Sequence, residues 1–156
     1  MQHLASFVCG TWVKGEGEGQ TLFNPATEEP IARASSDGVD LGAALDFARS
    51  KGGPALRALS FAERGALLKG MADALQGARD ELLELGVRNC GNTRSDAKFD
   101  VDGAIATLLA YAELGTQLGA GRYLVDGEGI QLGRSPRFHG QHVRVPRHGV
   151  AVHINA

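Results

Sequence analysis

Residues 149–156 narrow the choice of fold more than any other part of the sequence. They read Gly-Val-Ala-Val-His-Ile-Asn-Ala, an apolar run of small and β-branched residues that is entered through Pro146 and Gly149. Such a run is typical of a buried strand inside a parallel sheet that is covered on both faces. A strand of this kind needs neighbours, and the upstream strand candidates are short and flanked by polar residues. We therefore expect the chain to be the front portion of a larger enzyme.

The first 34 residues predict short strands joined by turns. Residues 4–13 suit a strand, a turn at Gly10-Thr11 and the start of a second strand. Residues 21–23 and 30–34 suit two more strands, because Asn24-Pro25-Ala26-Thr27 between them is a turn sequence. We expect these segments to form an antiparallel meander at the edge of the fold.

The segment 14–20, Lys-Gly-Glu-Gly-Glu-Gly-Gln, has two interpretations. Alternating glycines are found in phosphate-binding loops, which lie between a strand and the amino terminus of a helix. Glu16 and Glu18 would repel a phosphate, and no helix is predicted to follow. The sequence favours a mobile hairpin tip.

Three amphipathic helices are predicted between the two sets of strands. The first begins after Asp40 and is expected to end at Gly52-Gly53-Pro54. A capping box at Ser60-Phe61-Ala62-Glu63 predicts the start of a second, long helix with a break near Gly77. A loop is expected from Gly86 to Asp96, with Thr93 or Ser95 capping the third helix. The apolar stripe of that helix consists of Val101, Ile105, Leu108, Ala112 and Leu114.

The segment after these helices predicts a loop and a hairpin. The glycine-rich stretch 115–129 favours a surface loop, and residues 131–132 and 141–145 favour two strands separated by 134–140. Such a hairpin leaves a sheet edge that another strand or another subunit commonly covers.

Composition and charge exclude several classes of protein. The chain is 43% hydrophobic and 22% charged with a formal net charge of -2, which is ordinary for a soluble globular protein and argues against general attraction to nucleic acid or an anionic membrane. It contains neither an apolar stretch long enough for a membrane span nor a signal peptide at its amino terminus, so a cytoplasmic location is expected. Cys9 and Cys90 are the only cysteines, too few for a disulfide framework or a zinc cluster.

Three groups of residues invite chemical interpretations, and each has a simpler alternative. Cys90 could be a nucleophile, but the sequence supplies no partner base, and an unreactive thiol is the usual fate of a lone cysteine. The histidines could bind a metal, but alternate positions of a strand face opposite sides, so no metal site is predicted. The basic segment 134–148 could bind nucleic acid, but Phe138 is its only aromatic residue, and base stacking usually needs several. A solvated or subunit-facing hairpin is therefore favoured over a nucleic-acid site. The histidines of this part of the chain are His139, His142, His148 and His153.

Several stretches resemble the amino-terminal portion of the aldehyde dehydrogenases. Within that superfamily the chain is most similar to the enzymes of bacterial aerobic phenylacetate breakdown and the related benzoyl-CoA route. The matching pieces are Gly10-Thr11-Trp12, Phe23-Asn24-Pro25-Ala26-Thr27, Arg64 with Leu67-Leu68, and Pro146-Arg147-His148-Gly149-Val150 for the superfamily, and residues 1–7, 54–58, 91–96 and 149–156 for the narrower group.

The resemblance implies a fold and a function for the longer protein. The fold is α/β, with residues 1–156 as part of an NAD(P)-binding domain, 130–147 as a hairpin of the oligomerisation sheet, and 149–156 as the first strand of the dinucleotide-binding sheet. It implies oxidation of an aldehyde, a CoA-linked semialdehyde in the narrower group, with NAD or NADP as cofactor and a homo-oligomeric enzyme. Ile154, Asn155 and Ala156 match the strand end that lies along the nicotinamide-side ribose.

The resemblance also implies that the catalytic residues lie outside this chain. In the family the nucleophilic cysteine, the general-base glutamate and the asparagine of the oxyanion hole come after the position of Ala156, and Cys90 does not match the nucleophile. No catalytic residue is therefore predicted among residues 1–156. Two alternatives stay open at this point, a non-enzymatic remnant that associates with full-length subunits and a small binding module built on the arginine-rich hairpin.

Overall fold

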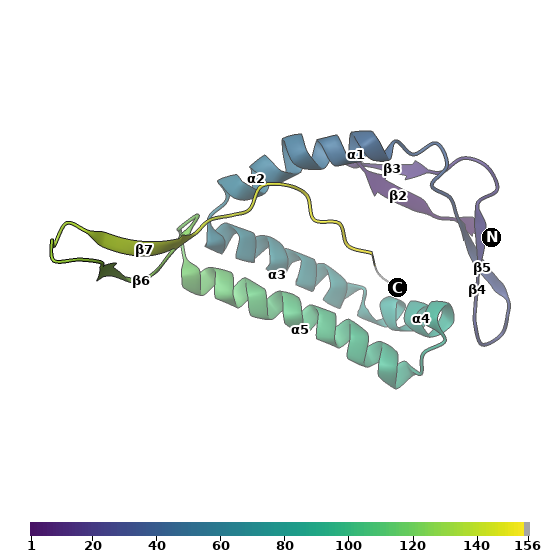
Figure 1. Ribbon diagram of the computed structural model, residues 1–156. Coiled ribbons are helices and arrows are strands. Elements are labelled where there is room, and N and C mark those ends of the chain that lie inside the picture. The colour runs from purple at the N-terminus through teal and green to yellow at the C-terminus, as the bar shows by residue number, and fades with distance from the viewer. Residues whose placement is uncertain (155–156) are drawn as a thin grey trace.

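The computed structural model describes residues 1–154 and shows a helical body with small sheets at both ends (Figure 1). Helices α3 (Phe61–Gly77) and α5 (Arg94–Leu118) lie side by side. The run from α1 (Leu41–Phe47) to α2 (Gly53–Ala58) crosses above them. A two-stranded arm projects from one end of the body, and the amino-terminal strands lie at the other.

The amino-terminal strands form two sheets instead of one meander. Strands β2 (Ala5–Val8) and β3 (Thr11–Lys14) are an antiparallel hairpin, as predicted, and Cys9 and Gly10 in its turn both have positive φ. The second sheet has the order β1-β5-β4, in which β1 (Gln2–His3) pairs in parallel with β5 (Pro30–Ala34), and β4 (Gln20–Phe23) pairs antiparallel with β5. The two predicted hairpins form, but the continuous meander is wrong, because β3 and β4 belong to different sheets and β1 joins the free edge of β5.

Residues 15–19 are not a hairpin tip, because β3 and β4 belong to different sheets. Gly15 is buried, and a Cβ placed on it would lie 2.1 Å from the carbonyl oxygen of Ser35. The N–H of Glu16 donates to the carbonyl of Asp37 at 2.8 Å. The glycines of this segment thus let it pass close to the backbone that follows β5.

The first helical segment continues through the predicted stop. Helix α1 (Leu41–Phe47) passes through a π-turn, η1 (Ala48–Gly52), into α2 (Gly53–Ala58). Pro54 is the second residue of α2 and has no N–H to donate, and the helical run passes this position through the π-turn, in which the N–H of Gly53 donates to the carbonyl of Ala48. The run ends at Leu59, whose backbone is extended.

The second helix begins where the capping box predicts it. In α3 (Phe61–Gly77), the Ser60 hydroxyl accepts a hydrogen bond from the N–H of Glu63 at 3.2 Å, and the Ser60 N–H donates to the Glu63 carboxylate at 2.7 Å. These bonds from Ser60 hold the pKa of Glu63 below its ordinary value of 4.5. The predicted break also occurs, because α3 ends at Gly77 and α4 (Arg79–Cys90) follows.

Two predicted loops consist mostly of helix and strand. Helix α4 runs to Cys90, so the loop before α5 (Arg94–Leu118) is short, and Thr93 caps α5. Gly86 lies inside α4, where a Cβ would come 3.3 Å from the Cβ of Ala97 on α5. Gly115 lies inside α5, so the predicted loop 115–129 shrinks to the connection between Leu118 and β6 (Leu124–Gln131). Both glycines permit close helix packing instead of breaking the helix.

The core lies between α3, α4 and α5. Ile105 and Ala112 of the predicted stripe are buried, Val101 and Leu108 are half-buried, and Leu114 is exposed. The buried residues of α3 are Gly65 and Ala72, and those of α5 are small apart from Ile105, which lets the two backbones approach closely. The buried apolar residues of these helices are Ala72, Leu83, Ala97, Ile105 and Ala112.

An arginine fork joins α4 to α5. Arg79 donates through Nε to Oδ1 of Asp102 at 2.6 Å and through Nη2 to Oδ2 at 2.9 Å. The Arg79 guanidinium holds the pKa of Asp102 below its ordinary value of 3.8, and the same bond raises the pKa of Arg79. The fork therefore ties the first residue of α4 to α5.

We predict that acid weakens this joint. The folded pKa of Asp102 lies below its unfolded value, so its contribution to stability is complete above pH 3.8 and is lost as the pH falls through the lower, folded value. Asp102→Asn should therefore reduce the fall in melting temperature between about pH 6 and about pH 2, as measured by circular dichroism. Asp73→Asn, which removes an exposed partner of Lys69 on one helix, should leave that fall largely unchanged. An unchanged fall in the Asp102 variant would contradict the fork's role.

The predicted strand at residues 149–156 is not formed in the described part of the chain. Residues 150–154 are neither helix nor strand, Val152 is 76% exposed and Ile154 is 91% exposed. Asn155 and Ala156 lie outside the described residues. A strand requires a neighbour that accepts and donates backbone hydrogen bonds, and none within residues 1–154 pairs with this segment.

Candidate functional site

The projecting arm is built from β6 (Leu124–Gln131) and β7 (His139–Arg144), and it confirms the predicted hairpin with a longer first strand. The strands pair antiparallel, and their register shifts between Asp126 and Ile130. Gly127 has φ +73° in that irregular part. Within residues 1–154 each strand pairs only with the other, so each has an edge that carries no strand. Such edges are the usual place for another chain to pair.

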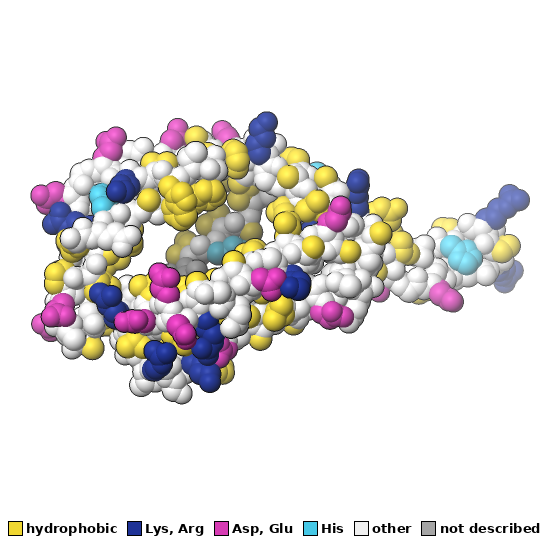
Figure 2. Space-filling model, turned by 180° about the vertical axis from the view of Figure 1, so that it is seen from behind, with side chains coloured by type: hydrophobic (Ala, Val, Ile, Leu, Met, Phe, Trp, Pro, Cys, Tyr) yellow, Lys and Arg dark blue, Asp and Glu magenta, His cyan; other side chains and the backbone are white. Residues whose placement is uncertain are grey.

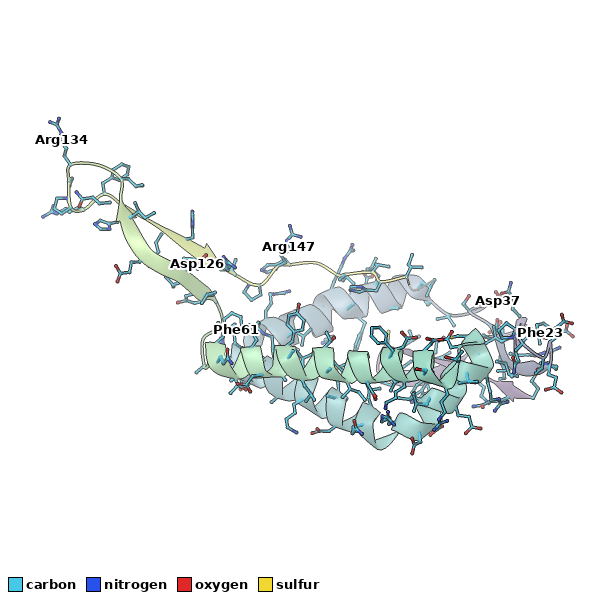
Figure 3. All side chains as sticks on the ribbon, turned by 90° about the horizontal axis from the view of Figure 1, so that it is seen from below. Phe23, Asp37, Phe61, Asp126, Arg134 and Arg147 are labelled. Carbon is cyan, nitrogen blue, oxygen red and sulfur yellow. The ribbon has the colours of Figure 1, made fainter. Side chains whose placement is uncertain are left out.

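One ion pair and two backbone bonds shape the arm. Arg144 donates to Asp126 at 2.6 Å across the hairpin, although both side chains are largely exposed. At the tip, the N–H of Leu132 donates to the carbonyl of Phe138 at 2.8 Å, and the N–H of Phe138 donates to the carbonyl of Ser135 at 3.1 Å. Arg134 stands at the outer end of this turn (Figure 3). The predicted basic segment is thus a solvated turn on a two-stranded stalk.

Much of the arm's surface is apolar. Ile130 is 66% exposed and Val145 is 66% exposed, and several other large apolar side chains of the arm are open to solvent. A shallow hollow of about 280 Å³ lies on one face between the two strands, lined in part by Ile130, Leu132 and His142. The other exposed apolar residues of the arm are Val125, Leu132, Phe138 and Val143.

Of the predicted cofactor residues, only Ile154 is described. It lies in the segment that leaves the arm and runs back along the body (Figures 1 and 3). Its side chain is 91% exposed, and its backbone belongs to no sheet. A dinucleotide is held by a loop or strand end set in a sheet and by a helix amino terminus, so residues 1–154 do not by themselves form such a site.

The two thiols are not placed for nucleophilic catalysis. Cys90 is the last residue of α4, at the opposite helix end from the one that stabilises an anion, and it is exposed. The side-chain amide of Asn89 donates to its sulfur at 3.8 Å. Cys9 donates to the carbonyl of Ala43 at 3.7 Å. Among the described residues neither thiol bonds to a basic group.

Neither a metal site nor a phosphate loop forms in the described part of the chain. No three histidine, cysteine, aspartate or glutamate side chains of residues 1–154 come close enough to hold an ion. The glycine loop 15–19 leads into strand β4 and not into a helix, so it lacks the helix amino terminus that binds phosphate. No helix of residues 1–154 combines the length and hydropathy that a membrane crossing needs.

An apolar groove and the ion pair of the arm are not predicted by the sequence. The groove, of about 310 Å³, lies between α4 and α5 and includes Leu82, Cys90 and Val101 in its lining. Its signal in the sequence is Gly86, a residue that is equally typical of a loop. The ion pair of Arg144 with Asp126 could have been found only with the hairpin register, which the register shift hides.

Comparison of the sequence with protein families identifies the family of this chain. The sequence pattern of the aldehyde dehydrogenase family matches residues 12–155, and the chain belongs to that family. Among individual proteins, the chain is 50% identical over 153 residues to the 3,4-dehydroadipyl-CoA semialdehyde dehydrogenase of Aromatoleum evansii. The aligned region covers 98% of this chain and 30% of that enzyme. The chain is 31% identical over 113 residues to the betaine aldehyde dehydrogenase of Bacillus subtilis (strain 168), covering 69% of this chain and 23% of that enzyme.

A solved structure has the same fold. The NAD-dependent benzaldehyde dehydrogenase of Corynebacterium glutamicum superposes with a TM-score of 0.68 over 83% of this chain and 28% of that protein, at 23% sequence identity. The α/β fold predicted from the sequence is thereby confirmed. The chain spans less than a third of the length of these relatives.

Proposed function

We propose that this chain is the amino-terminal part of an NAD(P)-dependent dehydrogenase that oxidises a CoA-linked semialdehyde to the acid in aerobic aromatic catabolism. The observation that carries the proposal is the 50% identity to an enzyme named for such a substrate, spread over 153 residues. The NAD-dependence in the name of the benzaldehyde dehydrogenase supports the cofactor class. A cytoplasmic location fits the proposal.

The proposal also assigns cofactor binding and catalysis to different parts of the enzyme. Residues 1–156 contribute to the cofactor-binding domain, with Ile154, Asn155 and Ala156 beside the dinucleotide. The thiol that attacks the aldehyde, the group that stabilises the oxyanion and the base that activates water belong to other parts of the enzyme. The exposed apolar segment 150–154 supports this division, because a strand within a larger sheet would bury it.

The arm is proposed as the oligomerisation element, over residues 130–147. Its unpaired strand edges and its exposed Ile130, Phe138 and Val143 support this role, because a second subunit would cover both. The active enzyme is accordingly proposed to be a homo-oligomer.

A hybrid enzyme tests the proposed function. Residues 1–156 replace the matching 30% of the Aromatoleum evansii enzyme, and NAD(P)H formation from its CoA-linked semialdehyde is measured by absorbance. We expect kcat/KM to lie within about tenfold of the parent value, which is a change of at most about 1.4 kcal/mol in transition-state stabilisation. In a matched hybrid, the corresponding 23% of the betaine aldehyde dehydrogenase replaces the same part of the Aromatoleum evansii enzyme. This second hybrid should lose far more activity on the CoA-linked semialdehyde. A folded hybrid of the first kind without turnover would contradict the proposal.

A further inference from the structure

Three aspartates of this chain are followed directly by glycine. The pairs are Asp37-Gly38, Asp102-Gly103 and Asp126-Gly127. Such a pair can rearrange without an enzyme, because glycine has no side chain to keep its N–H nitrogen away from the aspartate carboxyl group. The surroundings of each pair decide how fast it reacts, and the structure places the three pairs in different surroundings.

The rearrangement closes a ring and then opens it again. The N–H nitrogen of the glycine attacks the side-chain carboxyl carbon of the aspartate, and the new C–N bond completes a succinimide ring. The amide proton and the carboxyl hydroxyl leave together as water. Water then adds to one of the two ring carbonyls. Opening at the main-chain carbonyl leaves an isoaspartate, in which the main chain runs through the former side chain and is longer by one carbon atom.

Asp37 lies in an exposed turn. Asp37 and Gly38 are at the centre of this turn, which the N–H of Val39 closes by donating to the carbonyl of Ser36 at 3.1 Å. Within residues 1–154 the carboxylate of Asp37 makes no ion pair, and the N–H of Gly38 donates to no backbone carbonyl. Both reacting groups are therefore available to each other.

The end of the molecule that carries Asp37 is open to solvent. Figure 3 places Asp37 at the end of the body away from the arm, and acidic side chains project from that end in the space-filling view (Figure 2). A hollow of about 690 Å³ borders Asp37, so water reaches the ring for the second step. An exposed turn opens locally at a low cost in free energy, which lets the backbone nitrogen approach the carboxyl group.

The other two aspartates are held by arginines. Arg79 binds both carboxylate oxygens of Asp102, at 2.6 and 2.9 Å, and Arg144 binds Asp126 at 2.6 Å. A guanidinium group favours the ionised carboxylate, whereas ring closure needs the protonated carboxyl group, whose hydroxyl leaves as water. Gly103 also lies inside α5, where its N–H is bonded within the helix. Asp102 is therefore the better protected of the two, because its helix must open before the ring can form.

We propose that Asp37 is a site of spontaneous isomerisation at which this chain accumulates isoaspartate, while Arg79 and Arg144 protect the other two Asp-Gly pairs. The modified residue belongs to the substrate class of the isoaspartyl methyltransferases, which methylate its carboxylate with S-adenosylmethionine. The inference concerns the backbone of this chain and does not depend on the reaction that the enzyme catalyses.

Isomerisation at Asp37 removes a specific contact. The main-chain carbonyl of Asp37 accepts a hydrogen bond from the N–H of Glu16 at 2.8 Å. In an isoaspartate this carbonyl becomes part of a free carboxylate, and the former side-chain carbonyl precedes Gly38 in the main chain. The N–H of Glu16 thus loses its fixed acceptor. We expect hydrogen exchange at the Glu16 amide to become faster in proportion to the isoaspartate formed.

The three sites fall in different tryptic peptides, so their rates can be measured separately. The peptides are 34–49, 99–122 and 123–134, each with a single Asp-Gly pair. The 156-residue chain is kept in warm, mildly acidic buffer, and isoaspartate in each peptide is followed by mass spectrometry and by methyltransferase labelling. Peptide 34–49 should gain isoaspartate at least about tenfold faster than either other peptide, because ring closure there breaks neither an ion pair nor a helix.

Two comparisons show whether the structure causes this difference. In urea the three peptides should react at rates within about threefold of one another, because the ion pairs and the helix are lost. In the folded chain, Arg144→Gln should raise the rate in peptide 123–134 about fivefold, because the carboxylate of Asp126 loses its charged partner. Arg137→Gln is the matched control on the same arm. It removes an arginine that makes no ion pair within residues 1–154 and should leave the rate unchanged.

A substitution at the site itself completes the test. Asp37→Glu should abolish isoaspartate in peptide 34–49, because glutamate must close a larger ring that forms much more slowly. The substitution also separates Asp37 from Asp40 and Asp46, which lie in the same peptide. The proposal is overturned if peptide 34–49 gains no isoaspartate, if its isoaspartate survives Asp37→Glu, or if either other peptide reacts as fast in the folded chain. A difference between the peptides that persists in urea would equally overturn it.

Discussion

Replacing Gly115 by valine is expected to unfold the helical body. A Cβ at this position would lie 2.7 Å from the carbonyl oxygen of Phe61 and 3.0 Å from the Cα of Gly65. Both contacts are with the backbone of α3, which cannot move aside as a side chain can. The two helices must separate, and the small residues buried between them, such as Ala72 and Ala112, lose their contacts. We expect a loss of about 3 kcal/mol or more in the free energy of unfolding, a large part of the stability of an ordinary domain.

Other glycines of the same helices provide the controls. A Cβ added to Gly70 in α3 or to Gly103 in α5 would meet no other atom within 4 Å. Gly70→Ala and Gly103→Ala should each raise the free energy of unfolding by about 0.5–1 kcal/mol, because alanine loses less backbone entropy in a helix. Urea denaturation followed by circular dichroism measures all three variants. A Gly115→Val chain as stable as the original would mean that the helices do not cross this closely in solution.

The sequence predicts best those features that depend on neighbouring residues. The capping box at Ser60 and Glu63 forms as expected, because its two hydrogen bonds join residues three positions apart. The buried stripe of α5 is also predicted in large part, since Ile105 and Ala112 fall on one face by helical periodicity alone. Neither inference needs knowledge of the tertiary fold.

Glycine causes most of the errors in the predicted elements. The sequence places Gly86 and Gly115 in loops, but both lie within helices. Glycine is required at both positions because another helix packs there: Gly86 faces Ala97 of α5, and Gly115 faces Phe61 and Gly65 of α3. A single sequence cannot distinguish a glycine that ends a helix from one that lets another helix approach, because the two differ only in tertiary structure.

The segment 149–154 shows the same limit for a candidate site. Its apolar pattern is that of a buried strand, yet Val152 and Ile154 are exposed because no strand of residues 1–154 lies beside them. The pattern indicates that the segment is buried in its folded state, but it does not indicate which neighbouring strands bury it. Family membership therefore rests on the match over residues 12–155, and the absence of the strand from the described residues does not bear on it.

The isolated 156-residue chain is expected to show no aldehyde-dependent reduction of NAD or NADP. Covalent catalysis of this oxidation requires a thiolate and a base within hydrogen-bonding reach. Cys90 lies at the carboxyl end of α4 with the side-chain amide of Asn89 as its partner, and Cys9 donates to a backbone carbonyl. Without a covalent step the rate should fall by a factor of at least about 10⁶ from that of an active enzyme, which is below detection in an absorbance assay.

Substitution of Cys90 shows whether any residual activity of the isolated chain depends on this thiol. Cys90→Ser is introduced into both the isolated chain and the hybrid enzyme that carries residues 1–156. The hybrid should keep its full kcat, because the proposed nucleophile lies in the part of the hybrid that this chain does not supply. Turnover by the isolated chain that disappears with Cys90→Ser would show that this thiol is catalytic and would contradict the proposed division of labour. Since Cys90 is exposed and the hydroxyl of serine is close in size to the thiol, loss of folding is not expected to confuse the result.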